Sequence, residues 1–149
     1  MNKEFIMRGQ TASGQTEVLN FSGHTPGFAY RLTEFQLYPS TNIAGAPAEM
    51  VGTITAGKTA VAPTDPNFND EGLIASTSFF SGINNDLINN TNSVVNDKFL
   101  ITQDLILMVQ DKASAGAPIN WQCRFVGEKM SSNEEAVTNF RQYTISNDD

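Results

Sequence analysis

The chain has a single cysteine and a single histidine among its 149 residues. One cysteine excludes a disulfide within the chain. Cys123 alternates with Trp121 and Phe125, so we interpret it as a small buried hydrophobic residue and not as a reactive thiol, which would need surroundings that lower its pKa. His24 lies in the turn-rich segment SGHTPG, and no G-x-S-x-G motif accompanies it. A Ser-His-Asp site therefore has little support, and we predict that the protein is not an enzyme.

Basic residues are also scarce, because nine Lys and Arg stand against sixteen Asp and Glu, for a formal net charge of −7. A nucleic-acid backbone would repel such a surface, so we expect no nucleic-acid partner. The charge suits solubility, or docking onto a basic protein surface.

Long apolar runs are missing as well. The longest aliphatic run, residues 105–109, has five residues, whereas a membrane-spanning helix needs about 20. The first ten residues, MNKEFIMRGQ, contain no apolar stretch of the kind found in signal peptides. We therefore expect no membrane association.

Asn, Thr, Ser and Gly take the place of the missing charges, a bias typical of β-rich proteins with long polar loops. Short segments that resemble strands recur along the chain, at residues 3–9, 16–22, 28–39, 48–57, 72–80, 99–109 and 119–127. Asn-rich residues 84–92 read as a loop. In 28–39 the apolar residues move from even to odd positions, which predicts a bulge near Thr33 and Glu34, and Pro39 ends this strand.

Residues 105–109 are apolar on both faces, as in a central strand covered on both sides. Residues 119–127 alternate strictly, and the segment KASAGAP between the two has turn character. We predict that these two segments form a central antiparallel hairpin. Ile106 and Met108 would then need cover from the other sheet, a terminal helix or a neighbouring subunit.

The number and spacing of these segments predict a mainly β protein: an antiparallel β-sandwich or jelly-roll-like single domain over residues 1–149. We expect residues 1–15 to form an extended N-terminal arm, with a terminal strand as the other interpretation of 3–9. Capping-box spacing and helical periodicity predict a short helix at 132–143, with a further strand as the alternative. The predicted core comprises Phe35, Leu37, Leu105, Leu107, Trp121, Cys123 and Phe125.

Two motifs suggest ligands. Residues 52–59, GTITAGKT, match the phosphate-binding pattern G-x-x-x-x-G-K-[ST], but TIT reads as strand and two prolines follow without helical periodicity. We therefore reject nucleotide hydrolysis and expect no cofactor. Asp65, Asn67 and Asn69 mimic the first ligands of a calcium loop, although Asp70 takes the place of its glycine and Ser76 that of its final glutamate. These residues, with Asp70, are weak candidates for a metal site. The alternative is a solvated turn before a strand.

Four segments, GQTASGQTEVLNF, YRLTEFQLYPS, DPNFNDEGLIA and VVNDKFLITQDLILMV, resemble small proteins encoded beside the major capsid protein in tailed phages of marine bacteria. The resemblance covers most of the chain, including NEEAVTNFRQY, and contains no catalytic motif. It implies a head decoration, or cement, protein that binds major capsid protein subunits as a homo-oligomer on the outer capsid surface, after assembly in the host cytoplasm. We expect the N-terminal residues Phe5, Ile6, Met7 and Arg8 to contact the capsid.

Two other functions remain open. A non-catalytic carbohydrate-binding or tail-fibre-like β-module would present exposed aromatic residues, for which Tyr30, Tyr38 and Tyr143 are candidates. An unrecognised hydrolase would need His24 or Cys123 in a cleft with carboxylates.

Overall fold

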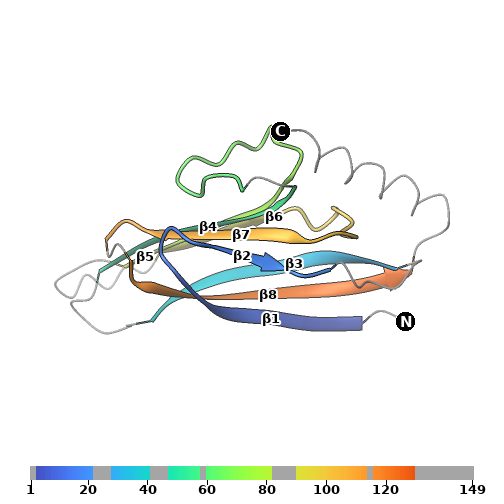
Figure 1. Ribbon diagram of the computed structural model, residues 1–149, viewed down its shortest axis with the longest axis horizontal. Coiled ribbons are helices and arrows are strands. Elements are labelled where there is room, and N and C mark those ends of the chain that lie inside the picture. The colour runs from blue at the N-terminus through green and yellow to red at the C-terminus, as the bar shows by residue number, and fades with distance from the viewer. Residues whose placement is uncertain are drawn as a thin grey trace.

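The computed structural model of the chain describes residues 3–21, 28–40, 47–57, 60–81, 90–113 and 116–129. These residues form eight strands: β1 (Lys3–Ala12), β2 (Thr16–Leu19), β3 (Phe28–Pro39), β4 (Ala48–Ala56), β5 (Leu73–Ser81), β6 (Asn90–Val95), β7 (Leu105–Asp111) and β8 (Pro118–Lys129). Sheet A has the order β1-β8-β3, and sheet B has the order β2-β7-β4-β5-β6. All neighbouring strands are antiparallel, and the two sheets pack against each other (Figure 1). The predicted β-sandwich is confirmed; the helix predicted at 132–143 lies outside the described residues.

The core lies between the central strands of the two sheets. Along β8 every odd-numbered residue from Ile119 to Gly127 is buried, and along β7 the same holds from Leu105 to Asp111. Because of this alternation, every second side chain of each strand points toward the other sheet. All predicted core residues are buried, namely Phe35, Leu37, Leu105, Leu107, Trp121, Cys123 and Phe125.

The predicted hairpin is wrong, because β7 and β8 belong to different sheets. Each strand already has two partners: β7 lies between β2 and β4, and β8 lies between β1 and β3. The chain therefore passes from one sheet to the other between β7 and β8. A hairpin and such a crossover both turn the apolar residues of the two strands toward one core, so alternation could not tell them apart.

Other local predictions have mixed outcomes. The predicted bulge is confirmed, since the pairing of β3 with β8 skips Thr33 between Leu32 and Glu34, and Pro39 is the last residue of β3. Residues 3–12 form a strand paired with β8 along its whole length, not an extended arm. The loop predicted at 84–92 is wrong for residues 90–92, which begin β6. This polar edge strand lacks the apolar alternation by which strands are recognised.

The outer face of sheet B, turned away from sheet A, is partly covered by residues 60–72, which lie above it in Figure 1. Thr53 Oγ1 donates to the carbonyl of Val61 at 2.7 Å, and the Val61 amide donates to Thr55 Oγ1 at 3.2 Å. Both threonines are buried, although they point away from the core. Ile106 and Met108 on the same face are half-buried.

Candidate functional site: a polar groove on sheet A

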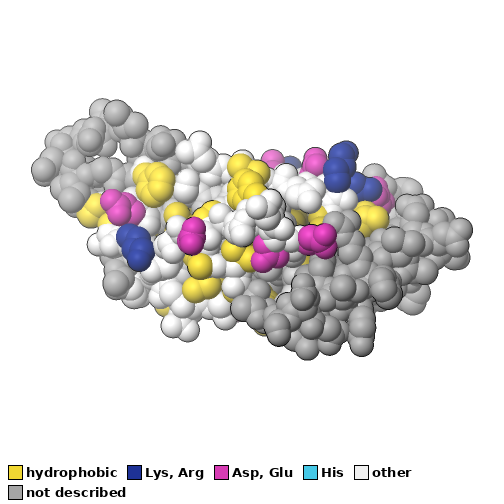
Figure 2. Space-filling view, turned by 90° about the horizontal axis from the view of Figure 1, so that it is seen from above, with side chains coloured by type: hydrophobic (Ala, Val, Ile, Leu, Met, Phe, Trp, Pro, Cys, Tyr) yellow, Lys and Arg dark blue, Asp and Glu magenta, His cyan; other side chains and the backbone are white. Residues whose placement is uncertain are grey.

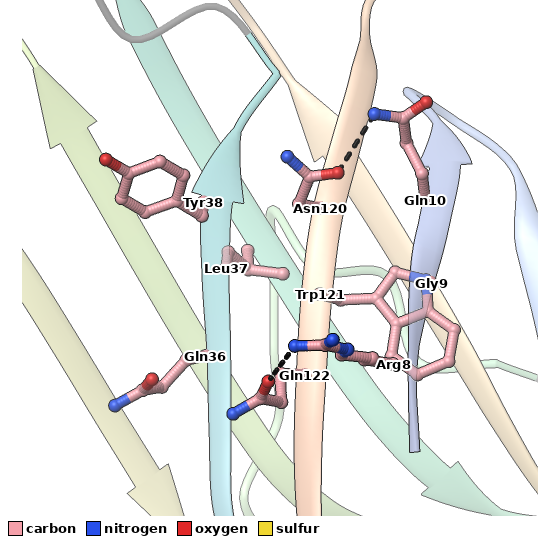
Figure 3. Close-up of a pocket in the computed structure, with 9 residues that line it drawn as sticks. All are labelled: Arg8, Gly9, Gln10, Gln36, Leu37, Tyr38, Asn120, Trp121 and Gln122. Atoms are coloured by element: carbon pink, nitrogen blue, oxygen red, sulfur yellow. Dashed lines mark hydrogen bonds between the residues drawn. The ribbon is translucent and has the colours of Figure 1, made fainter. Parts of the chain in front are cut away.

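The outer face of sheet A carries an open groove of about 670 Å³ across all three strands (Figure 3). Even-numbered residues point outward from β1 and β8, and the bulge gives β3 the same phase after Glu34. The side chains of the polar groove are Arg8, Gln10, Gln36, Tyr38, Asn120 and Gln122. Arg8 and Tyr38 were candidates from the sequence, but the four amides were not, and the sequence could not bring the six together because they lie on three strands far apart in the chain.

Strand register arranges these side chains in two rows. Gln122 is paired with Arg8 on one side and Gln36 on the other. Asn120 is paired in the same way with Gln10 and Tyr38. Each row therefore runs perpendicular to the strands, with an amide at its centre.

Hydrogen bonds orient the central amides. Gln10 Nε2 donates to Asn120 Oδ1 at 2.9 Å, and Asn120 Nδ2 donates to the carbonyl of Pro39 at 3.4 Å. In the other row Arg8 Nη1 donates to Gln122 Oε1 at 3.5 Å. An amide offers two donors and an acceptor with two lone pairs, and a guanidinium offers five donors, so the rows keep further bonding capacity for a ligand.

A buried tryptophan supports the groove from below. The indole of Trp121 lies against Gly9 and donates from Nε1 to Thr11 Oγ1 at 3.0 Å. A Cβ atom at Gly9 would come within 3.0 Å of Trp121 Cζ2, so the absence of a side chain there makes room for the ring. The floor is therefore a packed layer.

Charge distinguishes sheet A from the acidic chain as a whole. Among the described residues, all arginines lie on this sheet: Arg8, Arg31 and Arg124. Arg31 pairs with Glu128 at 2.5 Å, and Arg124 lies 3.8 Å from Glu34. In the described part of the chain, Arg8 contacts the neutral Gln122 and forms no ion pair. Within one copy of the chain, its guanidinium therefore keeps donors that no described acidic side chain uses.

The predicted contact residues of the N-terminal segment divide between two faces of β1. Ile6 is 50% exposed and Arg8 is exposed, so both can meet a partner. Phe5 and Met7 point inward and pack against the core, and the Phe5 ring stacks on Phe125 with centroids 5.3 Å apart. Both are half-buried, and capsid contact through Phe5, Ile6, Met7 and Arg8 stays a prediction.

The aromatic residues suggested for a carbohydrate-binding module also differ in exposure. Tyr38 is 52% exposed in the groove. Tyr30 is half-buried, with its ring 5.4 Å from that of Phe5 and 5.3 Å from that of Phe21. Tyr143 and His24 lie outside the described residues.

The calcium-like segment forms a turn held by its own side chains. Asn67 Oδ1 accepts from the amide of Asn69 at 3.0 Å, and Asp70 Oδ1 accepts from the amide of Gly72 at 2.9 Å. Such bonds are typical of Asx-turns. Within the described ranges, no group of three or more His, Cys, Asp or Glu residues could hold a metal ion. Asp65 is exposed in the same segment.

The phosphate-binding pattern and the cysteine are built into the sandwich. Residues 52–56 belong to β4, as the TIT interpretation predicted, and Lys58 and Thr59 lie outside the described residues. Cys123 is fully buried, and burial raises the pKa of its thiol well above the ordinary value. A protonated, inaccessible thiol is a poor nucleophile.

Comparison with protein-family models, with curated proteins and with solved structures finds no match to the chain. In the part of the chain that is described, no helix has the length and apolar character needed to cross a membrane.

Proposed function

We propose that the protein is a structural virion protein that decorates and stabilises the outer surface of a phage capsid by binding major capsid protein subunits. The observation that carries the structural part of this proposal is the polar groove on sheet A. Its rows of oriented amides, with Arg8 and Tyr38 at their ends, offer many hydrogen bonds to a protein surface. The resemblance of the chain to phage head proteins supplies the partner.

The composition of the groove supports a protein partner. Arginine and tyrosine are enriched at protein interfaces and dominate their binding energy, whereas lysine and acidic residues are depleted. The groove contains one arginine, one tyrosine and four amides, and no acidic residue. Many copies on one capsid would gain effective concentration, so each contact need not be strong.

The test measures occupancy on purified heads assembled from the major capsid protein. The variant replaces Gln36, Tyr38 and Gln122 by alanine, three exposed or half-exposed positions. The Tyr38 ring lies 6.1 Å from that of buried Phe79, so urea denaturation checks that the variant is still folded. We expect at least about a tenfold loss of occupancy, equivalent to about 1.4 kcal/mol or more of binding free energy.

The matched control changes the opposite side of the molecule. Val18 and Val94 are 63% and 55% exposed on the outer face of sheet B, and the double variant Val18→Thr/Val94→Thr alters that face without touching the groove. Occupancy should stay unchanged in this control. Equal occupancy of the groove variant and the original protein would refute capsid binding through the groove. Absence of the original protein from imaged heads would refute the function itself.

The groove also favours a second candidate, a non-catalytic carbohydrate-binding or tail-fibre-like module. Planar amides beside the half-exposed ring of Tyr38 can hold a sugar by hydrogen bonds and by packing. Glycan binding by the isolated protein, lost on Tyr38→Ala and accompanied by no affinity for capsids, would favour this candidate over decoration.

A further inference from the structure

Strand β1 leaves one edge of sheet A open. It has ten residues, contains no proline and pairs with β8 without a register shift. Its other side has no strand neighbour among the described residues. Proteins usually protect such edges with short strands, prolines, bulges or charged side chains, because free amides and carbonyls can pair with another chain. Of these devices β1 has only the charged residues Lys3, Glu4 and Arg8.

The other edge strands have such protection. At the opposite edge of sheet A, β3 contains a bulge between Leu32 and Glu34 and ends in Pro39. In sheet B, the edge strands β2 and β6 have only four and six residues. Among the described strands, β1 is therefore the edge best suited to pairing with another strand.

We propose that β1 pairs antiparallel with β1 of a second copy of this chain, about a two-fold axis that passes between the two Ile6 residues. A two-fold axis perpendicular to the sheet keeps each side chain on its own face. With the axis at Ile6, Glu4 of each copy lies opposite Arg8 of the other. Phe5 then lies opposite Met7 on the inner face, and the two three-stranded sheets become one sheet of six strands.

Charge selects this register among its neighbours. An axis at Arg8 would place two arginines opposite each other, and an axis at Glu4 would do the same with two glutamates. An axis at Met7 would place Ile6 opposite Arg8 and leave Glu4 opposite Gln10. Of these registers, only the one with its axis at Ile6 places apolar Ile6 opposite Ile6 and acidic Glu4 opposite basic Arg8 on the outer face. Cross-strand pairs of opposite charge stabilise a sheet, and like charges destabilise it.

Burial supports the same register. Ile6 is 50% exposed, although it is a large apolar residue in the middle of a strand, and Phe5 and Met7 are only half-buried. Directly opposed residues in antiparallel strands have Cβ atoms about 4.5–5.5 Å apart, so two Ile6 side chains would cover each other. The pairing would thus bury apolar surface that the single copy leaves in water. It needs no capsid and goes beyond the proposed function.

A charge-swap series tests the pairing by sedimentation velocity of the full chain. We expect the original protein to form dimers of twice the 16.2 kDa monomer mass. Glu4→Arg and Arg8→Glu each create two like-charge pairs and should weaken dimerisation by about tenfold or more. The double variant Glu4→Arg/Arg8→Glu restores opposite pairs and should dimerise nearly as well as the original. A monomeric original protein, or a double variant no better than the single ones, would overturn the proposal.

Cross-linking tests the position of the axis. Ile6→Cys places two thiols opposite each other and should give a disulfide-linked dimer under mild oxidation. Gln10→Cys is the matched control, because it leaves the Glu4–Arg8 pairs intact and the two thiols would lie eight residues apart along the strands, about 26 Å. Cys123 is buried and should add no background. A dimer from Gln10→Cys without one from Ile6→Cys would place the axis elsewhere and overturn the assignment.

Discussion

The two outer faces of the sandwich use polar residues in opposite ways. On sheet B, Thr53 and Thr55 form hydrogen bonds with Val61 and so hold the following loop against the sheet. On sheet A, the amides of Asn120 and Gln122 bond to neighbouring side chains and keep bonding capacity toward solvent. The first face stabilises the fold, and the second leaves hydrogen-bonding groups exposed to solvent.

The apolar residues of the two faces differ as well. Figure 2 views the molecule from the side of sheet B and shows hydrophobic side chains in small groups among polar ones. The exposed apolar residues Val18, Phe80 and Val94 belong to three strands of this sheet that are not all neighbours. Val94 lies beside exposed Phe68 in a shallow hollow of about 180 Å³, whereas Val18 and Phe80 stand apart, as single apolar residues commonly do on protein surfaces. Exposed Ile6, by contrast, lies on an open edge and beside the polar groove.

The largest effects should come from the inner faces, where the two sheets are equivalent. Phe125 of β8 and Leu107 of β7 are both fully buried. We expect Phe125→Ala to lower the free energy of unfolding by about 3–5 kcal/mol and Leu107→Ala by about 2–5 kcal/mol, because each leaves a cavity. Urea denaturation measures both, with exposed Val18→Ala as a control that changes stability by less than about 0.5 kcal/mol. If one of these two variants lost less than about 1 kcal/mol of unfolding free energy, the sheet that carries it would contribute little to the stability of the core.

The inner faces were also the part that the sequence predicted best. Strict alternation in 119–127 and the apolar run at 105–109 identified β7 and β8 and their buried residues. The phase shift in 28–39 located the bulge of β3, because a change of phase within one strand has few other physical causes. Burial leaves a local pattern, and a local pattern is visible in one sequence.

The pairing of residues on neighbouring strands leaves no such local pattern in the sequence. The pairing of Gln122 with Arg8 and Gln36 joins residues that are more than eighty positions apart, and polar residues at alternate positions look alike on any exposed face. For the same reason the sequence could not show that β7 and β8 belong to different sheets, or that polar β6 is a strand. The groove depends on register, and register requires the tertiary fold.

A second prediction compares the polar residues of the two outer faces. Thr53→Val keeps the shape of the side chain and removes its bond to the Val61 carbonyl, so we expect a loss of about 1–3 kcal/mol in stability. Gln36→Ala on sheet A should change stability by no more than about 0.5 kcal/mol, because this side chain is exposed. Urea denaturation of both variants checks the difference. Equal losses of stability in the two variants would contradict the proposal that the outer face of sheet B stabilises the fold while that of sheet A is free to bind.

The smallest effects concern two glycines whose missing side chains would point into the sandwich. A Cβ at Gly52 of β4 would lie 3.2 Å from both Phe35 Cζ and Leu37 Cδ1, and a Cβ at Gly9 of β1 would lie 3.0 Å from Trp121 Cζ2. Distance alone would make Gly9→Ala the more damaging change. However, β4 is paired on both sides, whereas β1 of a single copy is paired only with β8 among the described strands, so in the monomer it can move outward.

Overpacking a core destabilises a protein by about 1–3 kcal/mol. Replacing glycine by alanine also stabilises it by about 0.4–1 kcal/mol, because it lowers the conformational entropy of the unfolded chain. We therefore expect Gly52→Ala to destabilise the protein by about 1 kcal/mol and Gly9→Ala to change stability by less than about 0.5 kcal/mol. Urea denaturation measures both, and the indole fluorescence of Trp121 reports whether its ring has moved. A larger loss of stability for Gly9→Ala than for Gly52→Ala would mean that β1 cannot move outward. The Trp121–Thr11 hydrogen bond would then hold β1 in place as a second neighbouring strand would.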